Sequence, residues 1–222
     1  MEQIAMRCVA ARLMLTAAIV GVRFASPSET SGEELSVTIR IHDYSRVPSD
    51  SLSRATAIVT RTYEKIGVRT EWMGVARPAE RRTESERGEA SRVPAAQLTI
   101  IILTPKMAAR ARVAEDVLGY AAVPDEGMGR IAFAIYERVR AAARRIPANE
   151  GELLGFVMTH EIGHLVLPRG SQPDTGPMKN HWQLRDLQRL DLRALDFSAE
   201  EAREIRRTLE NASLKNPEHV RR

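Results

Sequence analysis

A capped helix with two histidines on one face is predicted between Asn149 and Pro168. Asn149 is a favourable N-cap residue, and Glu152 three positions later completes a capping-box pattern. Apolar residues then recur at helical spacing until the proline ends the helix. Within this helix lies the sequence His160-Glu-Ile-Gly-His164, an HExxH pattern. Both imidazoles must therefore lie on the same side of the helix, about one turn apart.

The spacing of His160 and His164 suits a metal ion. Two imidazoles one turn apart can reach the same ion at about 2.1 Å. Glu161, beside the first histidine, is placed to accept a proton from metal-bound water rather than to bind the metal. Zn²⁺ lowers the pKa of such a water to about 7, and the carboxyl group can later pass the proton to a leaving amine. We therefore predict a zinc site with His160 and His164 as ligands and Glu161 as the general base.

Cysteine content limits the residue types that can bind a metal, and the distribution of charge bears on a nucleic-acid partner. The only cysteine is Cys8, which lies in a predicted export segment, so a metal site in the mature chain must use histidines and carboxylates. The 33 Lys and Arg residues against 29 Asp and Glu residues give a net charge of +4. The basic residues follow no face or stripe, and no basic patch is interleaved with aromatic residues. We therefore predict no nucleic-acid partner.

The N-terminal segment has the features of an export signal. Arg7 and Arg12 precede an apolar run that is followed by small residues suited to a cleavage site. The apolar run is too short for a standard membrane span. We expect a secreted, periplasmic or membrane-anchored protein. Its predicted divisions are a signal peptide or membrane anchor over 1–26, a linker over 27–34 and one zincin-like domain over 35–222.

The rest of the domain is predicted to combine strands and helices. A helix is expected over 49–66, followed by Gly67 at its C-terminal end, and further helices over 181–192 and about 198–214. Strands are predicted over 35–42, 68–73, 97–103, 118–123 and 131–136. These elements predict an α+β fold, with a mixed sheet of about five strands, a crossing helix, the HExxH helix and a short helical C-terminal part.

The segment 160–178 resembles the zincin metallopeptidases and, within them, the metzincins. In metzincins the HExxH helix ends in a turn, a third ligand follows, and a methionine turn lies beneath the metal. Met178, after Gly176 and Pro177, corresponds to that methionine. The segment is also similar to uncharacterised bacterial proteases that carry HEIGHLLLG, a histidine and a Gly-Ile-Met sequence. The resemblance implies a zincin-like fold, a Zn²⁺ cofactor and a peptide or protein substrate.

The third zinc ligand is where this sequence departs from the metzincin pattern. That pattern continues HExxHxxGxxH, but Leu167 and Gly170 occupy the glycine and histidine positions. Gln172 stands where the bacterial relatives have their histidine, and glutamine is a poor zinc ligand. Asp174, in the same loop, offers a carboxylate oxygen. We therefore predict Asp174 as the third ligand, with His181 and Gln172 as alternatives.

Other features bear on substrate binding and on the kind of activity. The strand over 131–136 is predicted either as an edge strand that pairs with an extended substrate or as a core strand. Tyr120 or Tyr136 is a candidate to stabilise an oxyanion, although buried aromatic residues more often serve packing. The predicted function is a zinc-dependent peptidase. The alternatives are a catalytically inactive zincin-derived binding module, which Gln172 favours, and a hydrolase of non-peptide amides.

Overall fold

The computed structural model describes residues 35–74, 95–124, 127–146, 148–168, 176–179 and 196–214. The predicted signal segment and linker, the predicted helix over 181–192, and the three candidate third ligands Asp174, Gln172 and His181 lie outside these ranges. Within them, no helix combines the length and the apolar character needed to cross a bilayer.

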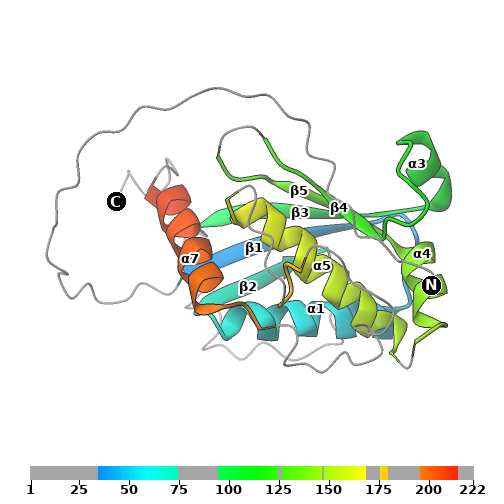
Figure 1. Ribbon diagram of the computed structural model, residues 1–222, viewed down its shortest axis with the longest axis horizontal. Helices are drawn as coiled ribbons and strands as arrows, with labels where there is room; N and C mark the ends of the chain where they lie inside the picture. Colours follow the sequence, from blue (N-terminus) through cyan, green and yellow to red (C-terminus); the bar gives the residue numbers. More distant parts are fainter. Residues whose placement is uncertain are drawn as a thin grey trace, which may run out of the picture.

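A five-stranded mixed sheet forms the centre of the fold (Figure 1). Its order is β2-β1-β3-β5-β4, in which β4 runs antiparallel to β5 and the other neighbours are parallel. The strands are β1 (Leu35–Asp43), β2 (Val68–Met73), β3 (Ala96–Leu103), β4 (Gly119–Ala122) and β5 (Ile131–Ile135). Burial alternates along most of β3: Leu98, Ile100 and Ile102 are buried on one face, whereas Gln97 is exposed and Thr99 and Ile101 are half-buried on the other.

The helices lie largely on one face and at the ends of this sheet. They are α1 (Ser49–Glu64), α3 (Pro105–Arg110), α4 (Tyr136–Ala143), α5 (Glu150–Val166) and α7 (Ala199–Leu214). Figure 1 shows α1 and α5 side by side over the sheet, with α7 near the C-terminal end of α5 and α4 near its N-terminal end. The predicted α+β fold class, with its mixed sheet, crossing helix and C-terminal helix, is confirmed.

The central helix α5 lies very close to α1. A β-carbon at Gly151 would come within 2.7 Å of the Ser51 carbonyl oxygen, and one at Gly155 within 2.9 Å of the Ala55 carbonyl oxygen. Glycine at these two positions therefore lets the two helix backbones approach each other. The sheet, α1 and the short segment 176–179 pack around α5, so nearly all residues of α5 are buried. The capping box that the sequence predicted at Asn149 is present, with both of its hydrogen bonds.

The predictions for the strand over 131–136 need two corrections. β5 ends at Ile135, and Tyr136 begins helix α4, whose Ala- and Arg-rich sequence favours a helix. Of the two alternatives for this strand, the core position is confirmed and the edge position is wrong, because β5 pairs with β3 on one side and with β4 on the other. Among the described strands, β4 forms this edge of the sheet. Its position follows from long-range pairing, which the local sequence pattern does not determine.

Candidate metal centre

His160 and His164 converge on the same side of α5. Their Nε2 atoms are 2.9 Å apart, and their rings stand nearly perpendicular at 86° with centroids 4.5 Å apart. Two imidazole nitrogens bound to one tetrahedral zinc ion at about 2.1 Å would lie roughly 3.4 Å apart. A relaxation of a few tenths of an ångström therefore brings this pair to zinc-binding separation. The predicted juxtaposition of these two side chains is present in the structure.

A backbone carbonyl fixes the orientation of His160. Its Nδ1 lies 2.6 Å from the Pro177 oxygen, and because a carbonyl only accepts, Nδ1 must carry the proton. The Nε2 atom of the neutral ring then presents a lone pair toward His164. Metal-ligating histidines commonly donate their other ring N–H to a carbonyl or carboxylate in this way. Sequence reasoning did not identify the Pro177 carbonyl, since a backbone atom has no residue-specific signal.

The carbonyl belongs to a short turn, Gly176–Lys179, which we call the Pro177 turn. Its ends are joined by a hydrogen bond from the Lys179 N–H to the Gly176 carbonyl at 3.2 Å. Met178 is completely buried and packs against Gly163, where a β-carbon would overlap the methionine sulfur. The turn is thus seated against the helix between the two histidine positions. This places Met178 directly beside the histidine pair.

Glu161 lies beside the first residue of the edge strand. A β-carbon at Gly119 would lie 2.9 Å from Cγ of Glu161 and 2.7 Å from Cγ1 of Val157. The carboxyl side chain is only 3% exposed, and burial raises its pKa well above the ordinary value. A carboxylate with a raised pKa is a stronger base than an exposed one, which suits it to take up and return a proton.

Burial also determines the charge of the two histidines. It lowers the pKa of His160 to about 4, although the Pro177 carbonyl opposes part of this shift. Burial and the neighbouring His160 ring lower the pKa of His164 to about 3. Both rings are therefore neutral at neutral pH, which is the form that binds a metal ion. Nε2 of His160 accepts the hydrogen bond from the Nε2–H of His164, and both nitrogens can bind one zinc ion once His164 carries its proton on Nδ1 instead.

A zinc site of the catalytic type has three protein ligands, and among the described residues only His160 and His164 are placed to serve as two of them. Within those ranges, no third His, Cys, Asp or Glu side chain joins the histidine pair. The predicted ligand Asp174 and its alternatives Gln172 and His181 fall outside the described residues.

Neither tyrosine considered for oxyanion stabilisation adjoins the histidine pair. Tyr120 stacks on Phe133, with ring centroids 4.4 Å apart, on the opposite face of the sheet from α5. Burial raises the pKa of the Tyr136 hydroxyl to about 12, and the neighbouring carboxyl group of Glu150 adds to the shift. Glu150 begins α5 and lies ten residues, or about 15 Å along the helix, from His160. The packing role that the sequence also allowed therefore fits both residues.

Comparison with known proteins gives a limited result. No known protein family and no curated protein matches the sequence. Among solved structures, the archaemetzincin from Methanopyrus kandleri aligns over 82% of this chain and 99% of its own, with 16% identity and a TM-score of 0.41.

Proposed function

We propose that the protein is a zinc-dependent peptidase. The observation that carries this proposal is the convergence of two neutral imidazoles, His160 and His164, with Nε2 atoms 2.9 Å apart on a helix that also bears the buried Glu161. Two histidine ligands and an adjacent carboxyl group are among the parts that metal-assisted hydrolysis of an amide requires, and a third ligand completes them. The export segment predicted from the sequence would place this activity outside the cytoplasm or at the membrane.

In the proposed site, His160, His164 and Asp174 hold the ion. When bound, zinc acts as a Lewis acid that polarises a carbonyl group and makes water more acidic. Asp174 is proposed from the sequence, because its carboxylate suits zinc and the mature chain offers no cysteine. The Pro177 carbonyl keeps the His160 ring turned so that Nε2 faces the ion.

Glu161 acts as the proton-transfer group. Its carboxylate removes a proton from the attacking water and returns it to the nitrogen of the leaving amine as the C–N bond breaks. Burial raises the pKa of Glu161, which makes its carboxylate a better acceptor for the proton of the water. The protonated carboxyl group can then donate this proton to the leaving amine.

The edge strand gives a physical basis for a peptide substrate. β4 has one hydrogen-bonding side occupied by β5, and an extended peptide can add to the other side by backbone hydrogen bonds. Gly119, the first residue of β4, lies against Glu161, so a peptide on this strand would pass beside the proposed base. We propose that β4 has this role, which the sequence analysis considered for the strand over 131–136.

Metal analysis and a peptide assay test the proposal. Purified protein spanning Ser28–Arg222 is expected to bind about one zinc per chain, and His164→Ala is expected to lose it. Glu161→Gln should retain zinc but lose hydrolysis of a peptide library. Small amides are assayed beside the peptide library, because cleavage of the small amides alone would favour the non-peptide hydrolase. Folded protein that binds no zinc would contradict the proposal and favour the inactive binding module.

A further inference from the structure

The Pro177 turn is covered by the chain that leads into α7. Gly176 has a φ of +79°, and a β-carbon there would lie 3.1 Å from the Asp196 carbonyl oxygen and 3.9 Å from Oε2 of Glu201. The next residue, Pro177, supplies the carbonyl that accepts the hydrogen bond from His160. The start of α7 is therefore one residue away from the atom that orients a proposed zinc ligand.

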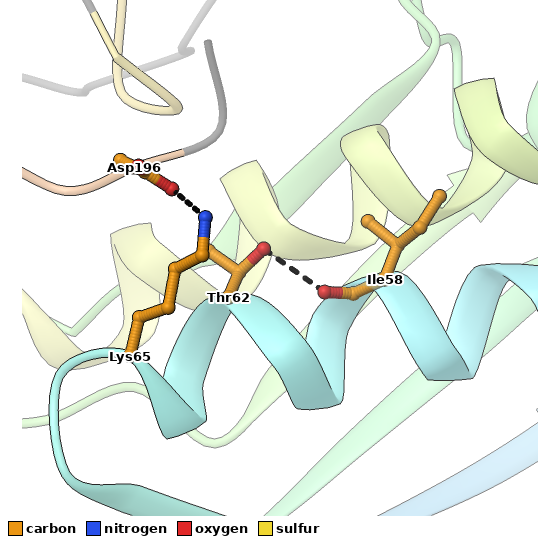
Figure 2. A network of polar contacts seen from close by, with 4 residues as sticks. All are labelled: Ile58, Thr62, Lys65 and Asp196. Atoms are coloured by element: carbon orange, nitrogen blue, oxygen red, sulfur yellow. Dashed lines mark hydrogen bonds and ion pairs between the residues drawn. The ribbon is translucent and has the colours of Figure 1, made fainter. Parts of the chain in front are cut away.

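This end of α7 is attached to the C-terminal end of α1. Lys65 forms an ion pair with Asp196, as Figure 2 shows. Beside it, the rings of Tyr63 and Phe197 meet edge to face, with centroids 5.3 Å apart. The exposed ion pair contributes little by itself, but the buried aromatic contact fixes the position of the segment. The surface that covers Gly176 is thus part of the packed core.

Glu201 is a capping residue that is buried more deeply than capping requires. Its Oε2 accepts a hydrogen bond from the Ser198 N–H at 2.7 Å, and its own N–H donates to the Ser198 Oγ at 3.2 Å. Glu152 has the same role in the capping box of α5, but its side chain is only partly buried. Glu201 is 6% exposed, and its Oε1 has no hydrogen-bond partner among the described residues.

Burial of this carboxylate has a cost that capping alone does not explain. A charged group taken out of water needs compensating contacts, and an exposed glutamate would cap the helix equally well. Burial raises the pKa of the Tyr63 hydroxyl, and the nearby negative charge of Glu201 raises it further. Tyr63 in turn contacts the Thr159 carbonyl, immediately before His160. The carboxylate is thus packed between α7, α1 and the turn that holds His160.

We propose that Glu201 is a positioning residue for the metal centre: by fixing the start of α7 against Gly176, it holds the Pro177 carbonyl in line with Nδ1 of His160. The inference rests on the proposed function, because the orientation of His160 matters only if the ring binds a metal ion. Replacing the carboxylate by an amide weakens the capping box and loosens the turn. His160 then loses its fixed tautomer, and its Nε2 lone pair is no longer constantly available.

Long-range ¹H–¹⁵N spectra of the histidine rings in the metal-free protein at pH 7.5 test the proposal directly. In the wild type, His160 is expected as the single tautomer protonated at Nδ1. In Glu201→Gln the His160 signals should broaden or show a mixture of tautomers, and zinc affinity measured by competition with a chelator should fall about tenfold. The matched control is Glu200→Gln, an exposed glutamate in the same helical turn, which should change neither readout.

Each outcome decides between a positioning role and a purely structural one. A Glu201→Gln protein that unfolds at lower temperature but keeps the wild-type His160 spectrum and zinc affinity would overturn the proposal. If Glu201→Gln does not fold, the milder Ser198→Ala, which removes only the acceptor for the Glu201 N–H, should shift the same His160 signals, and an unchanged spectrum would overturn the proposal. Wild-type protein that binds no zinc would instead contradict the proposed function, since the tautomer is measured without metal.

Discussion

Met178 packs directly against Gly163, so that a β-carbon at the glycine would overlap the methionine sulfur and lie 3.1 Å from its methyl carbon. Glycine in the middle of a helix costs about 1 kcal/mol relative to alanine. The space it leaves is used here by the Pro177 turn, whose carbonyl holds His160. The helical glycine is thus explained by the close approach of the turn to the histidine face.

Replacing Gly163 by alanine is therefore expected to destabilise the protein by roughly 1–3 kcal/mol, despite the better helix propensity of alanine. The added carbon would push Met178 and its turn away from α5, and zinc affinity should fall as well. Chemical denaturation of four proteins measures the coupling: the wild type, Gly163→Ala, Met178→Ala and the double variant. In the Met178→Ala background the glycine substitution should cost much less. Additive effects of the two changes would contradict the packing argument.

Arg138 of α4 holds the loop that precedes the edge strand. Its guanidinium donates hydrogen bonds to the carbonyls of Val117 at 2.8 Å and Val113 at 3.1 Å, and also to that of Ala114. Arg138→Ala should destabilise the protein by roughly 1–3 kcal/mol and speed amide exchange in the loop and in β4. Arg138→Lys should not restore protection, because an ammonium group lacks the planar fork.

The comparison for this prediction lies in the same helix. Arg144, at the C-terminal end of α4, is exposed, and its replacement by alanine should leave exchange in β4 unchanged. Equal effects of the two substitutions would show that Arg138 acts through the general stability of α4. Exchange measured residue by residue separates these outcomes, since only loss of the specific contacts concentrates the change near β4.

The parts of the fold that sequence analysis predicted correctly are those fixed by local signals. Helix α5 begins at the predicted capping box, because Asn149 and Glu152 satisfy each other's backbone groups within one turn. The histidine pair follows from the four-residue spacing alone. α3 was not predicted, although Thr104 caps it and Pro105 occupies its first turn, since six residues are too few for a periodic pattern.

The features that were missed depend on contacts between distant segments. The edge position of β4 follows from the pairing of β5 with β3, and strand order leaves no local pattern. The group that orients His160 is a carbonyl, which every residue possesses, so Pro177 could not be identified by its type. Glycine at 119 and 163 was the available signal, because both glycines mark a close approach to α5.

Glu161 is expected to destabilise the metal-free protein at neutral pH. Burial raises its pKa above 4.5, so the folded state retains the proton at pH values where the unfolded chain has lost it. The penalty is absent below about pH 4.5, the ordinary value, and grows as the pH rises through the folded-state pKa. Glu161→Gln removes the titrating group and should raise the melting temperature at pH 7.5 by on the order of 5 °C.

Thermal unfolding in the presence of a chelator at pH 4 and pH 7.5 measures this effect. The difference in melting temperature between Glu161→Gln and the wild type should be large at pH 7.5 and should nearly vanish at pH 4. The control is Glu210→Gln, because Glu210 of α7 is exposed. Glu152→Gln would be unsuitable as a control, because that side chain caps α5. A difference that does not vary with pH would show that the substitution acts through packing.

Zinc affinity should be insensitive to pH over a wider range than an exposed histidine pair allows. An ordinary histidine has a pKa of 6.5, so protons compete with the metal below that value. Burial lowers the pKa of His160 to about 4 and that of His164 to about 3, so both rings remain neutral in the folded protein at pH 5.

The same shifts make the metal-free fold acid-sensitive. A folded-state pKa below 6.5 means that the unfolded chain binds protons first, so stability falls as the pH drops from about 6.5 toward 4. We therefore expect chelator competition to give nearly constant zinc affinity from pH 8 to pH 5, while the melting temperature of the metal-free protein falls below pH 6.5. The zinc-bound protein should lose less stability over this interval, because bound zinc excludes protons from both rings. An affinity that declines tenfold per pH unit from pH 6.5 downward would mean that the histidines are accessible to protons, and the buried arrangement of the pair would then be wrong.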